Sequence, residues 1–187
     1  MTPPAPEAAT VIALIGNPNT GKSTLFNALT GLRQKTANYP GVTVERHTGE
    51  IVLAGQPVTL VDLPGAYSLA AQSPDEMVAI DVLLGHVTDL PRPRAVLAVV
   101  DATNLRRNLF LVTQLAELGL PLVVALNVSD VAESRGIRID TAELGRQLGA
   151  TVVRVSAARE TGLPGSSGEL DAVPSRVRTP SHRCRPT

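Results

Sequence analysis

Short runs of apolar residues alternate along the chain with segments in which apolar residues recur every three or four positions. Continuous, β-branched apolar runs are typical of buried strands, and the wider spacing is typical of amphipathic helices. The runs predict strands at residues 10–16, 49–55, 57–65, 95–102, 120–130 and 151–157. The wider spacing predicts helices at residues 21–31, 76–84, 104–119 and 141–149. Residues 32–47 follow neither period, so a long loop is expected there.

The order of these elements predicts an α/β fold. Strands that are hydrophobic along their whole length and alternate with helices form mostly parallel sheets with helices on both faces. We expect about six strands, with the second one, residues 49–55, antiparallel to the others. The domain is expected to span residues 10–163. Residues 1–9 and 164–187 follow no period and are rich in Pro with Ala or with Ser and Arg, so they are expected to be disordered.

Composition narrows the classes of protein to which the chain can belong. The formal net charge is zero, which argues against broad electrostatic binding to nucleic acid or to an anionic membrane. The single cysteine, Cys184, supports neither a disulfide framework nor a metal cluster. The longest apolar runs are far shorter than the roughly 20 residues of a membrane-spanning helix. The sequence therefore predicts a cytoplasmic chain with no nucleic-acid partner, and it leaves open whether the chain forms a homo-oligomer.

Four polar clusters lie at the ends of four predicted strands. "GNPNTGKS" begins at Gly16, "DLPG" at Asp62, "NVSD" at Asn127 and "SA" at Ser156. Parallel sheets bind their ligands at the carboxyl ends of the strands. We therefore expect the four clusters to meet at one edge of the sheet and to form one site.

The first cluster fits the phosphate-binding pattern Gly-x-x-x-x-Gly-Lys-Ser. Glycines let the backbone wrap closely around phosphate oxygens, and the following helix adds its positive N-terminal end. Lys22 is expected to neutralise the outer phosphates, and the Ser23 hydroxyl is expected to bind Mg²⁺. The residues expected around the phosphates are Gly16, Asn17, Pro18, Asn19, Thr20, Gly21, Lys22, Ser23 and Thr24. The alternative is a chance match in a glycine-containing turn, which the position between a strand and a helix disfavours.

The third cluster fits the guanine signature Asn-x-x-Asp. The Asp130 carboxylate can accept hydrogen bonds from both the N1–H and the exocyclic amine of guanine. Asn127 is expected to bond the base and to tie its loop to the phosphate loop, and the backbone N–H groups of Ser156 and Ala157 are expected to complete the base pocket. Alone, the pattern is weak, because ordinary turns and helix caps use the same residues. Val128 stands where lysine is common, so looser binding and faster nucleotide release are expected.

Two further segments are expected to respond to the third phosphate. Asp62 would hold Mg²⁺ through water, and the Gly65 N–H would sense the γ-phosphate. Thr43, in "GVTVE", would bind Mg²⁺ only when the γ-phosphate is present, although a plain threonine at a strand entry is the alternative. Many GTPases place a glutamine directly after this glycine to orient the attacking water. Here that residue is Ala66, so either hydrolysis is very slow or another group stabilises the transition state.

Together these residues resemble a known family. The segments "GNPNTGKSTLFNALTG", "NYPGVTVERHTGEI", "VTLVDLPGAYSL", "VVDATNLRRNLFL", "ALNVSD" and "VSA" are similar, in order and spacing, to the cytoplasmic G domain of the bacterial ferrous iron transport protein B family. The resemblance implies a Ras-like P-loop GTPase fold that binds GTP or GDP with Mg²⁺ and hydrolyses GTP slowly. It places Asn19, Lys22, Thr43 and Gly65 at the reaction centre. For full-length members it implies a helical spacer and a domain in the bacterial inner membrane that passes Fe²⁺.

The resemblance also implies a role for Asn19. In GTPases of this kind that lack the glutamine, this asparagine helps to coordinate K⁺ beside the phosphates. Backbone carbonyl groups of residues 37–40 would complete the shell. The cation would stabilise transition-state charge as an arginine finger does. The alternative is that Asn19 only braces the loop.

Two departures from the family pattern leave other functions open. The family usually has methionine at the position of Val128, and residues 164–187 do not show the helices that follow the G domain in the family. This tail is expected to come from a truncated or out-of-frame gene product. One alternative is therefore a truncated fragment that binds nucleotide without turnover. Another is a GTPase of ribosome assembly, which the lack of a basic RNA-binding extension disfavours.

Overall fold

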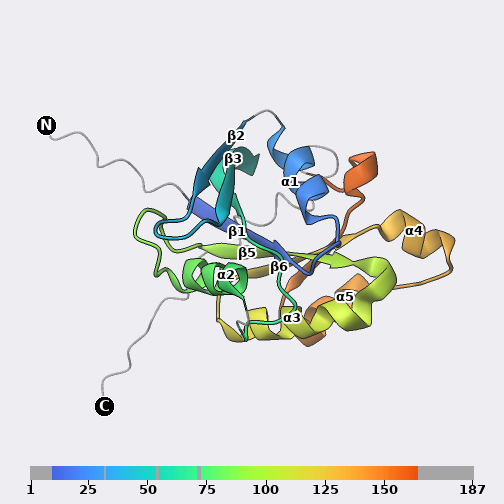
Figure 1. Cartoon of the computed structure of the whole chain (residues 1–187). Coiled ribbons are helices and arrows are strands. Elements are labelled where there is room, and N and C mark those ends of the chain that lie inside the picture. Colours follow the sequence, from blue (N-terminus) through green and yellow to red (C-terminus); the bar gives the residue numbers. More distant parts are fainter. Residues whose placement is uncertain (1–9, 32, 54, 71–72, 164–187) are drawn as a thin grey trace, which may run out of the picture.

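The computed structural model describes residues 10–31, 33–53, 55–70 and 73–163. The disorder expected for residues 1–9 and 164–187 lies outside this part of the chain. The described residues form a seven-stranded sheet in the order β2-β3-β4-β1-β5-β6-β7, with helices on both faces (Figure 1). The strands are β1 (Thr10–Gly16), β2 (Gln34–Asn38), β3 (Glu45–Leu53), β4 (Gln56–Asp62), β5 (Ala95–Asp101), β6 (Leu122–Asn127) and β7 (Thr151–Arg154).

One strand of the sheet runs against the others. β3 pairs antiparallel with both β2 and β4, whereas the pairs β4–β1, β1–β5, β5–β6 and β6–β7 are parallel. The expected α/β fold with a mostly parallel sheet is confirmed, and β3 corresponds to the strand expected to be antiparallel. The helices are α1 (Lys22–Thr30), α2 (Pro74–Leu84), α3 (Leu105–Glu117), α4 (Ser129–Ser134) and α5 (Thr141–Leu148), with short 3₁₀ turns η1 (Ala102–Asn104) and η2 (Ala157–Arg159).

β2 is a strand that the hydrophobic pattern does not predict. It lies within the stretch 32–47 that was expected to be a loop, and it gives the sheet seven strands instead of about six. All five of its residues, "QKTAN", are exposed, and it pairs with β3 from Gln34↔Gly49 to Asn38↔Glu45. An exposed edge strand is held by backbone hydrogen bonds, so its side chains carry no apolar alternation.

Two helices also depart from the pattern. α2 begins at Pro74, earlier than residue 76, because the Ser73 hydroxyl accepts a hydrogen bond from the Glu76 N–H at 3.2 Å. Ser at the cap followed by Pro is a common way to start a helix. α4 is a short helix in a stretch expected to end a strand, and it follows directly from the polar cluster that begins at Asn127.

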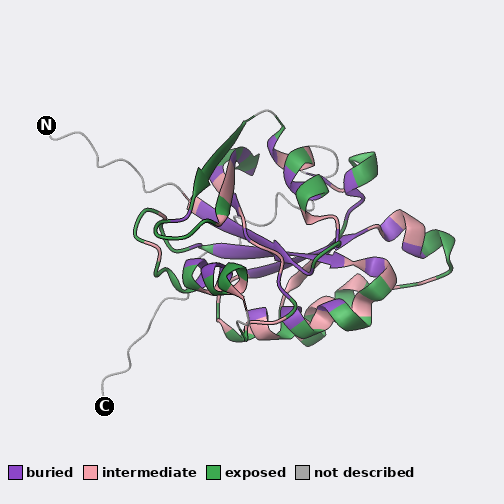
Figure 2. Ribbon diagram, viewed as in Figure 1, coloured by how far each residue is buried: buried purple, intermediate pink, exposed green. Residues whose placement is uncertain are grey.

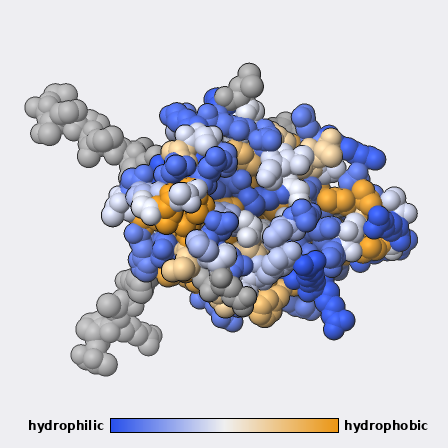
Figure 3. Space-filling view, viewed as in Figure 1, coloured by the Kyte–Doolittle hydropathy of each residue, from blue (hydrophilic) through white to orange (hydrophobic). Residues whose placement is uncertain are grey.

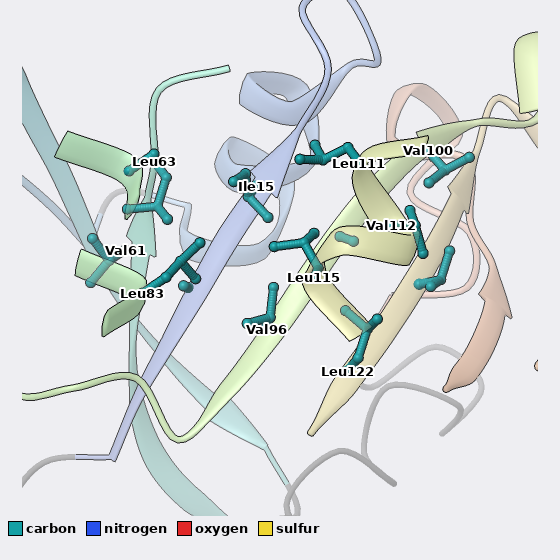
Figure 4. Close-up of a cluster of buried hydrophobic side chains, with 14 of the residues drawn as sticks. Ile15, Val61, Leu63, Leu83, Val96, Val100, Leu111, Val112, Leu115 and Leu122 are labelled. Atoms are coloured by element: carbon teal, nitrogen blue, oxygen red, sulfur yellow. The ribbon is translucent and has the colours of Figure 1, made fainter. Parts of the chain in front are cut away.

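α2, α3 and α5 cover one face of the sheet, and Figure 4 shows part of the core between them. Leu111, Val112 and Leu115 of α3 are at most 1% exposed, and they belong to the same cluster as Ile15 and Val96 of the sheet. Complete burial of such a side chain contributes about 1.5–3 kcal/mol to stability. This layer therefore fixes α3 firmly against the central strands.

α1 lies on the opposite face. Its Leu25 and Phe26 are 0% and 3% exposed and pack in a second cluster with Leu14 of β1. The helix approaches β3 closely, because a Cβ atom on Gly49 would lie 2.2 Å from Thr30 Cγ2. This packing sets the direction in which the N-terminus of α1 points, at the carboxyl end of β1.

Burial follows these layers. β1, β5 and β6 are buried along almost their whole length, whereas β2 and the outer sides of the helices are exposed (Figure 2). On the face shown in Figure 3, hydrophobic residues gather between the β2–β3 loop and α2, and again around α4. None of the helices in the described ranges has the length and apolar character needed to cross a bilayer.

Candidate functional site

The four polar clusters lie at one edge of the sheet. Strand register pairs Leu14 with Asp62, Gly16 with Val99, and Asp101 with Asn127, so these strand ends are level with one another. Ser156 follows β7, the outermost of the parallel strands, at the same edge. In Figure 1 this edge is the end of the sheet toward which β1, β5 and β6 point. The convergence expected from the sequence is present.

The phosphate-loop segment has a backbone that suits its residues. Asn19 and Gly21 have φ angles of 66° and 80°, in the left-handed region that Gly adopts freely and that Asn tolerates better than most residues. A Cβ atom on Gly21 would lie 2.4 Å from Asn127 Nδ2, so glycine is required there for space as well. The Thr20 hydroxyl donates to the Asn17 carbonyl at 2.9 Å and closes the turn from inside.

Asn127 joins three of the clusters. Its Nδ2 donates to the Thr20 carbonyl at 3.0 Å, and its Oδ1 accepts from the Ala157 N–H at 3.0 Å. The side chain is buried, with 3% of the residue exposed. The expected tie between the Asn-x-x-Asp loop and the phosphate loop therefore exists, and it extends to the segment after β7.

The backbone N–H groups of Ser156 and Ala157 do not match the expectation. The Ala157 N–H is donated to Asn127, and the Ser156 N–H is donated to the Thr161 carbonyl at 3.0 Å. Thr161 returns a second bond from its own N–H to the Ser156 carbonyl at 3.2 Å. Neither N–H is free for a base in this structure, because both are used to fold the loop on itself and onto Asn127.

Lys22 and Asp62 form a direct ion pair across the site. The Lys22 ammonium contacts Asp62 Oδ1, and the two side chains are only 13% and 11% exposed. The Asp62 carboxylate therefore lies beside the phosphate loop, where it stabilises the positive charge of Lys22. The Ser23 hydroxyl, next to Lys22, is exposed. Carboxylate and hydroxyl oxygens are ligands that suit Mg²⁺, so these residues fit the expected metal.

Thr43 lies in the exposed loop between β2 and β3. Because His47 of β3 pairs with Asp62 of β4, this loop extends beyond the carboxyl end of β4, toward the site. The Thr43 hydroxyl forms no hydrogen bond with the described residues. The structure thus places Thr43 at the correct edge but does not join it to the other expected metal ligands.

Gly65 and Ala66 lie against the phosphate loop. The Ala66 N–H donates to the Gly16 carbonyl at 3.2 Å, and Ala66 is 1% exposed. A Cβ atom on Gly65 would lie 3.4 Å from Pro18, within ordinary contact. The Gly65 N–H has no hydrogen-bond partner among the described residues. The side chain at position 66 is thus buried, whereas the N–H before it is available as far as the described residues show.

The Asn19 side chain is exposed and forms no hydrogen bond with the described part of the chain. A side chain that braced the loop would bond to a neighbouring backbone group, so the bracing alternative receives no support from this geometry. The positive φ of Asn19 gives a separate reason for asparagine at this position.

The segments expected to bind the base have two features that motif reasoning misses. Val128 has a φ of 60°, which is unfavourable for a β-branched residue. Arg159 of η2 forms an ion pair with Asp130, with 2.9 Å between Nε and Oδ2. The Arg159 side chain is 71% exposed and that of Asp130 is 23% exposed. The only sequence signal for this pair is a basic residue two positions after Ala157.

A partly buried cluster at the base of the Thr43 loop is also missing from the sequence-based site. Tyr39 is 2% exposed, and Arg46 lies over its ring at 5.7 Å and pairs with Asp89 at 2.8 Å. Burial raises the pKa of Tyr39; Arg46 opposes this rise, while Asp62 and Asp89 add to it. The Tyr39 hydroxyl and Arg46 Nε are buried without hydrogen-bond partners among the described residues, as is Asn17 Nδ2. An aromatic residue within a polar loop is the only hint in the sequence.

Comparison with known proteins identifies the relatives of this chain. The family model for ferrous iron transport protein B matches residues 10–167. The Fe(2+) transporter FeoB of Legionella pneumophila (strain Paris) is 48% identical over 155 residues, which cover 81% of this chain and 20% of the relative. The corresponding transporter of Salmonella typhimurium (strain LT2) is 49% identical over 156 residues, with the same two coverages. The chain thus spans about a fifth of the length of these relatives.

Solved structures are similar as well. An S. thermophilus NFeoB mutant bound to mGDP superimposes with a TM-score of 0.80 at 44% identity, covering 89% of this chain and 62% of that one. The cytosolic domain of the T. maritima FeoB iron transporter in apo form gives a TM-score of 0.82 at 38% identity, with coverages of 94% and 66%. The FeoB G-domain from Methanococcus jannaschii gives 0.73 at 44% identity, with coverages of 90% and 97%.

Proposed function

The chain belongs to the ferrous iron transport protein B family, and on that basis we propose that it binds GTP and GDP with Mg²⁺ and hydrolyses GTP slowly. The observation that carries the proposal is the Asn127 side chain, whose two bonds of 3.0 Å connect the phosphate loop, the guanine signature and the segment after β7. A network of this kind brings a phosphate-binding loop and a base-reading carboxylate into one site. Similar G domains have been solved bound to GDP or mGDP, which supports the choice of nucleotide.

The phosphates would lie on the loop from Gly16 to Thr24, at the N-terminus of α1. Asp130 would accept the two donors on the guanine edge. For phosphate binding, Lys22 would leave Asp62 and contact the outer phosphates, and Asp62 and Ser23 would then hold Mg²⁺. Mg²⁺, when bound, neutralises the charge that develops on the phosphate oxygens.

Hydrolysis would depend on groups other than a glutamine. Ala66 is buried and has no side chain that could orient a water molecule. The Gly65 N–H, which has no partner in the described part of the chain, supports a contact with the γ-phosphate, and Thr43 would join the metal when its loop moves. The Asn19 amide is exposed and has no partner among the described residues, which supports K⁺ coordination beside the phosphates, where a cation supplies transition-state stabilisation.

In a longer parent protein, this domain would control the passage of Fe²⁺ through a membrane domain by way of a helical spacer. The support is family membership together with the length of the curated relatives, of which the chain covers 20%. By itself the chain would then act as the cytoplasmic, nucleotide-dependent part of a ferrous iron transporter.

A second candidate is a domain that binds nucleotide without turnover. The buried Ala66 favours it, because the usual water-orienting side chain is missing. Rates of GTP hydrolysis in KCl and in NaCl separate the two candidates. Faster hydrolysis in KCl, abolished by Asn19→Ala, would support the first candidate, and nucleotide binding without hydrolysis in either salt would support the second.

Calorimetry with GDP and ADP tests the common premise. The domain should bind GDP in the presence of Mg²⁺ and should not bind ADP. If ADP binds as tightly as GDP, the guanine site is wrong.

For the hydrolysis experiment, Asn104→Ala serves as a control for Asn19→Ala, because the Asn104 side chain is exposed and makes no capping hydrogen bond.

A further inference from the structure

The segment that follows Gly65 runs along one face of α3. The Arg107 guanidinium lies over the Tyr67 ring at 4.6 Å from its centroid, and the Leu69 N–H donates to Gln114 Oε1 at 2.8 Å. Arg107 and Gln114 are two helical turns apart, so both side chains project from the same side of α3. Two contacts from one helix therefore hold two residues of this loop.

The same segment is fixed on its other side by the phosphate loop and its strand. The Leu63 N–H donates to the Leu14 carbonyl at 2.9 Å, and the Ala66 N–H donates to the Gly16 carbonyl at 3.2 Å. Gly65 lies between these bonds, with its own N–H free of partners among the described residues. The position of that N–H thus depends on how well the chain is held on both sides.

We propose that Arg107 and Gln114 are positioning residues that hold the second switch, residues 65–70, so that the Gly65 N–H is already aligned with the γ-phosphate position. This inference rests on the proposed function. Neither residue touches the reacting atoms. They act through the backbone of the loop, by fixing Tyr67 and Leu69 against a helix that the core holds in place.

Burial alone does not account for the position of this loop. After Ala66, Tyr67 is 43% exposed, and the residues that follow are half-buried or exposed. α3, by contrast, is anchored by Leu111 and Leu115, which are at most 1% exposed. An exposed cation–π contact shifts an equilibrium by about two- to five-fold, and a single hydrogen bond shifts it by about three- to ten-fold. Effects of this size are enough to tune a switch without locking it.

Gln114 offers a clean test. Gln114→Leu removes the acceptor at similar size, whereas Gln114→Glu keeps an acceptor at the same place. We expect Gln114→Leu to weaken binding of a non-hydrolysable GTP analogue about three- to ten-fold relative to GDP and to leave GDP affinity unchanged. Gln114→Glu should retain the wild-type ratio. Glu117→Gln, exposed at the end of α3, is the matched control and should change neither affinity.

A second readout is independent of nucleotide. In the nucleotide-free protein, Gln114→Leu should speed hydrogen exchange at the Leu69 amide about three- to ten-fold. With Tyr39→Phe as background, Tyr67 is the only tyrosine left and the chain has no tryptophan, so the near-ultraviolet spectrum reports the Arg107 contact directly. Arg107→Leu should change this spectrum, and Arg107→Lys should restore part of it.

These measurements distinguish a failure of the positioning role from a failure of the proposed function. Unchanged Leu69 exchange in Gln114→Leu would show that the contact does not hold the loop. Faster exchange with an unchanged ratio of the two affinities would overturn the positioning role. If neither nucleotide binds to the wild-type protein, the proposed function fails, while the exchange and spectral measurements still decide whether α3 holds the switch. If Gln114→Leu does not fold, Arg107→Leu carries the same affinity test.

Discussion

The two halves of the site are built in opposite ways. On the base side, Asn127 is 3% exposed and ties the loops together with two bonds of 3.0 Å. On the γ-phosphate side, Thr43 is exposed without a hydrogen bond to the described residues, and the segment after Ala66 is held by surface contacts. Buried polar networks resist rearrangement, whereas exposed contacts break at little cost. Under the proposed function, this difference means that one half would bind the nucleotide and the other would respond to its third phosphate.

Breaking the rigid half should give the largest effect. Asn127→Leu leaves the Thr20 carbonyl and the Ala157 N–H without partners in a buried place. The free energy of unfolding should fall by about 2–5 kcal/mol, and GDP binding should be lost. Denaturant titration and calorimetry measure these two effects. Asn104→Ala should leave both close to wild type. A stable Asn127→Leu protein that still binds GDP would mean that the two Asn127 hydrogen bonds do not hold the site together.

A smaller effect on stability is expected at Tyr39, the buried residue of the β2–β3 loop. Tyr39→Phe removes a buried hydroxyl that has no hydrogen-bond partner within the described ranges, so the free energy of unfolding should rise by about 1 kcal/mol. Tyr67→Phe, at an exposed position, should change it little. Thermal unfolding of both variants measures the two changes. Equal changes in the melting temperatures of Tyr39→Phe and Tyr67→Phe would contradict the conclusion that the Tyr39 hydroxyl is buried without a partner in the described part of the chain.

The same tyrosine should give the protein an alkaline limit. Burial raises the pKa of Tyr39 in the folded state, so the folded protein keeps this proton more tightly than the unfolded chain does. The stability associated with Tyr39 is complete below the unfolded pKa of about 10 and is lost as the pH rises above it. Wild-type protein should therefore lose stability above about pH 10 more steeply than Tyr39→Phe does.

The smallest effect is expected at the rim of the base site. Arg159 pairs with Asp130, and guanine would need the same carboxylate. Arg159→Gln should raise GDP affinity by up to about five-fold, because an exposed ion pair is worth about 0–1 kcal/mol. Arg135→Gln is a control at another exposed arginine. Weaker binding in Arg159→Gln would mean instead that the arginine orients Asp130 for the base.

The sequence predicts those parts of the fold and of the site that produce a recognisable pattern of residues along the chain. The buried strands and the convergence of four clusters could be predicted, because hydrophobic runs and strand direction fix them. β2 could not, since it is polar, exposed and held by its backbone. The sequence predicts that the N–H groups of Ser156 and Ala157 face the base, whereas bonds to the nearby Thr161 and to the distant Asn127 side chain occupy them. The Thr161 bonds depend on loop geometry that no motif encodes.

Long-range side-chain pairs were missed for the same reason. Arg46 meets Asp89, and Gln114 meets the Leu69 N–H, across large separations in the chain. The spacing of these residues in the sequence does not predict which residue each one contacts. Only the packing of α3 and of the β2–β3 loop brings the members of each pair together. The tie through Asn127 was an exception, because its role is carried by a motif.

If Lys22 binds phosphate and Asp62 binds Mg²⁺ as proposed, the ion pair between them would make the binding of anions and of cations cooperative. An anion that draws the lysine away uncovers the aspartate, and a metal ion that takes the aspartate releases the lysine. Thermodynamic reciprocity requires each to increase the affinity for the other by the same factor. A nucleotide and its metal would then load as a unit, and the protein alone would hold either one weakly.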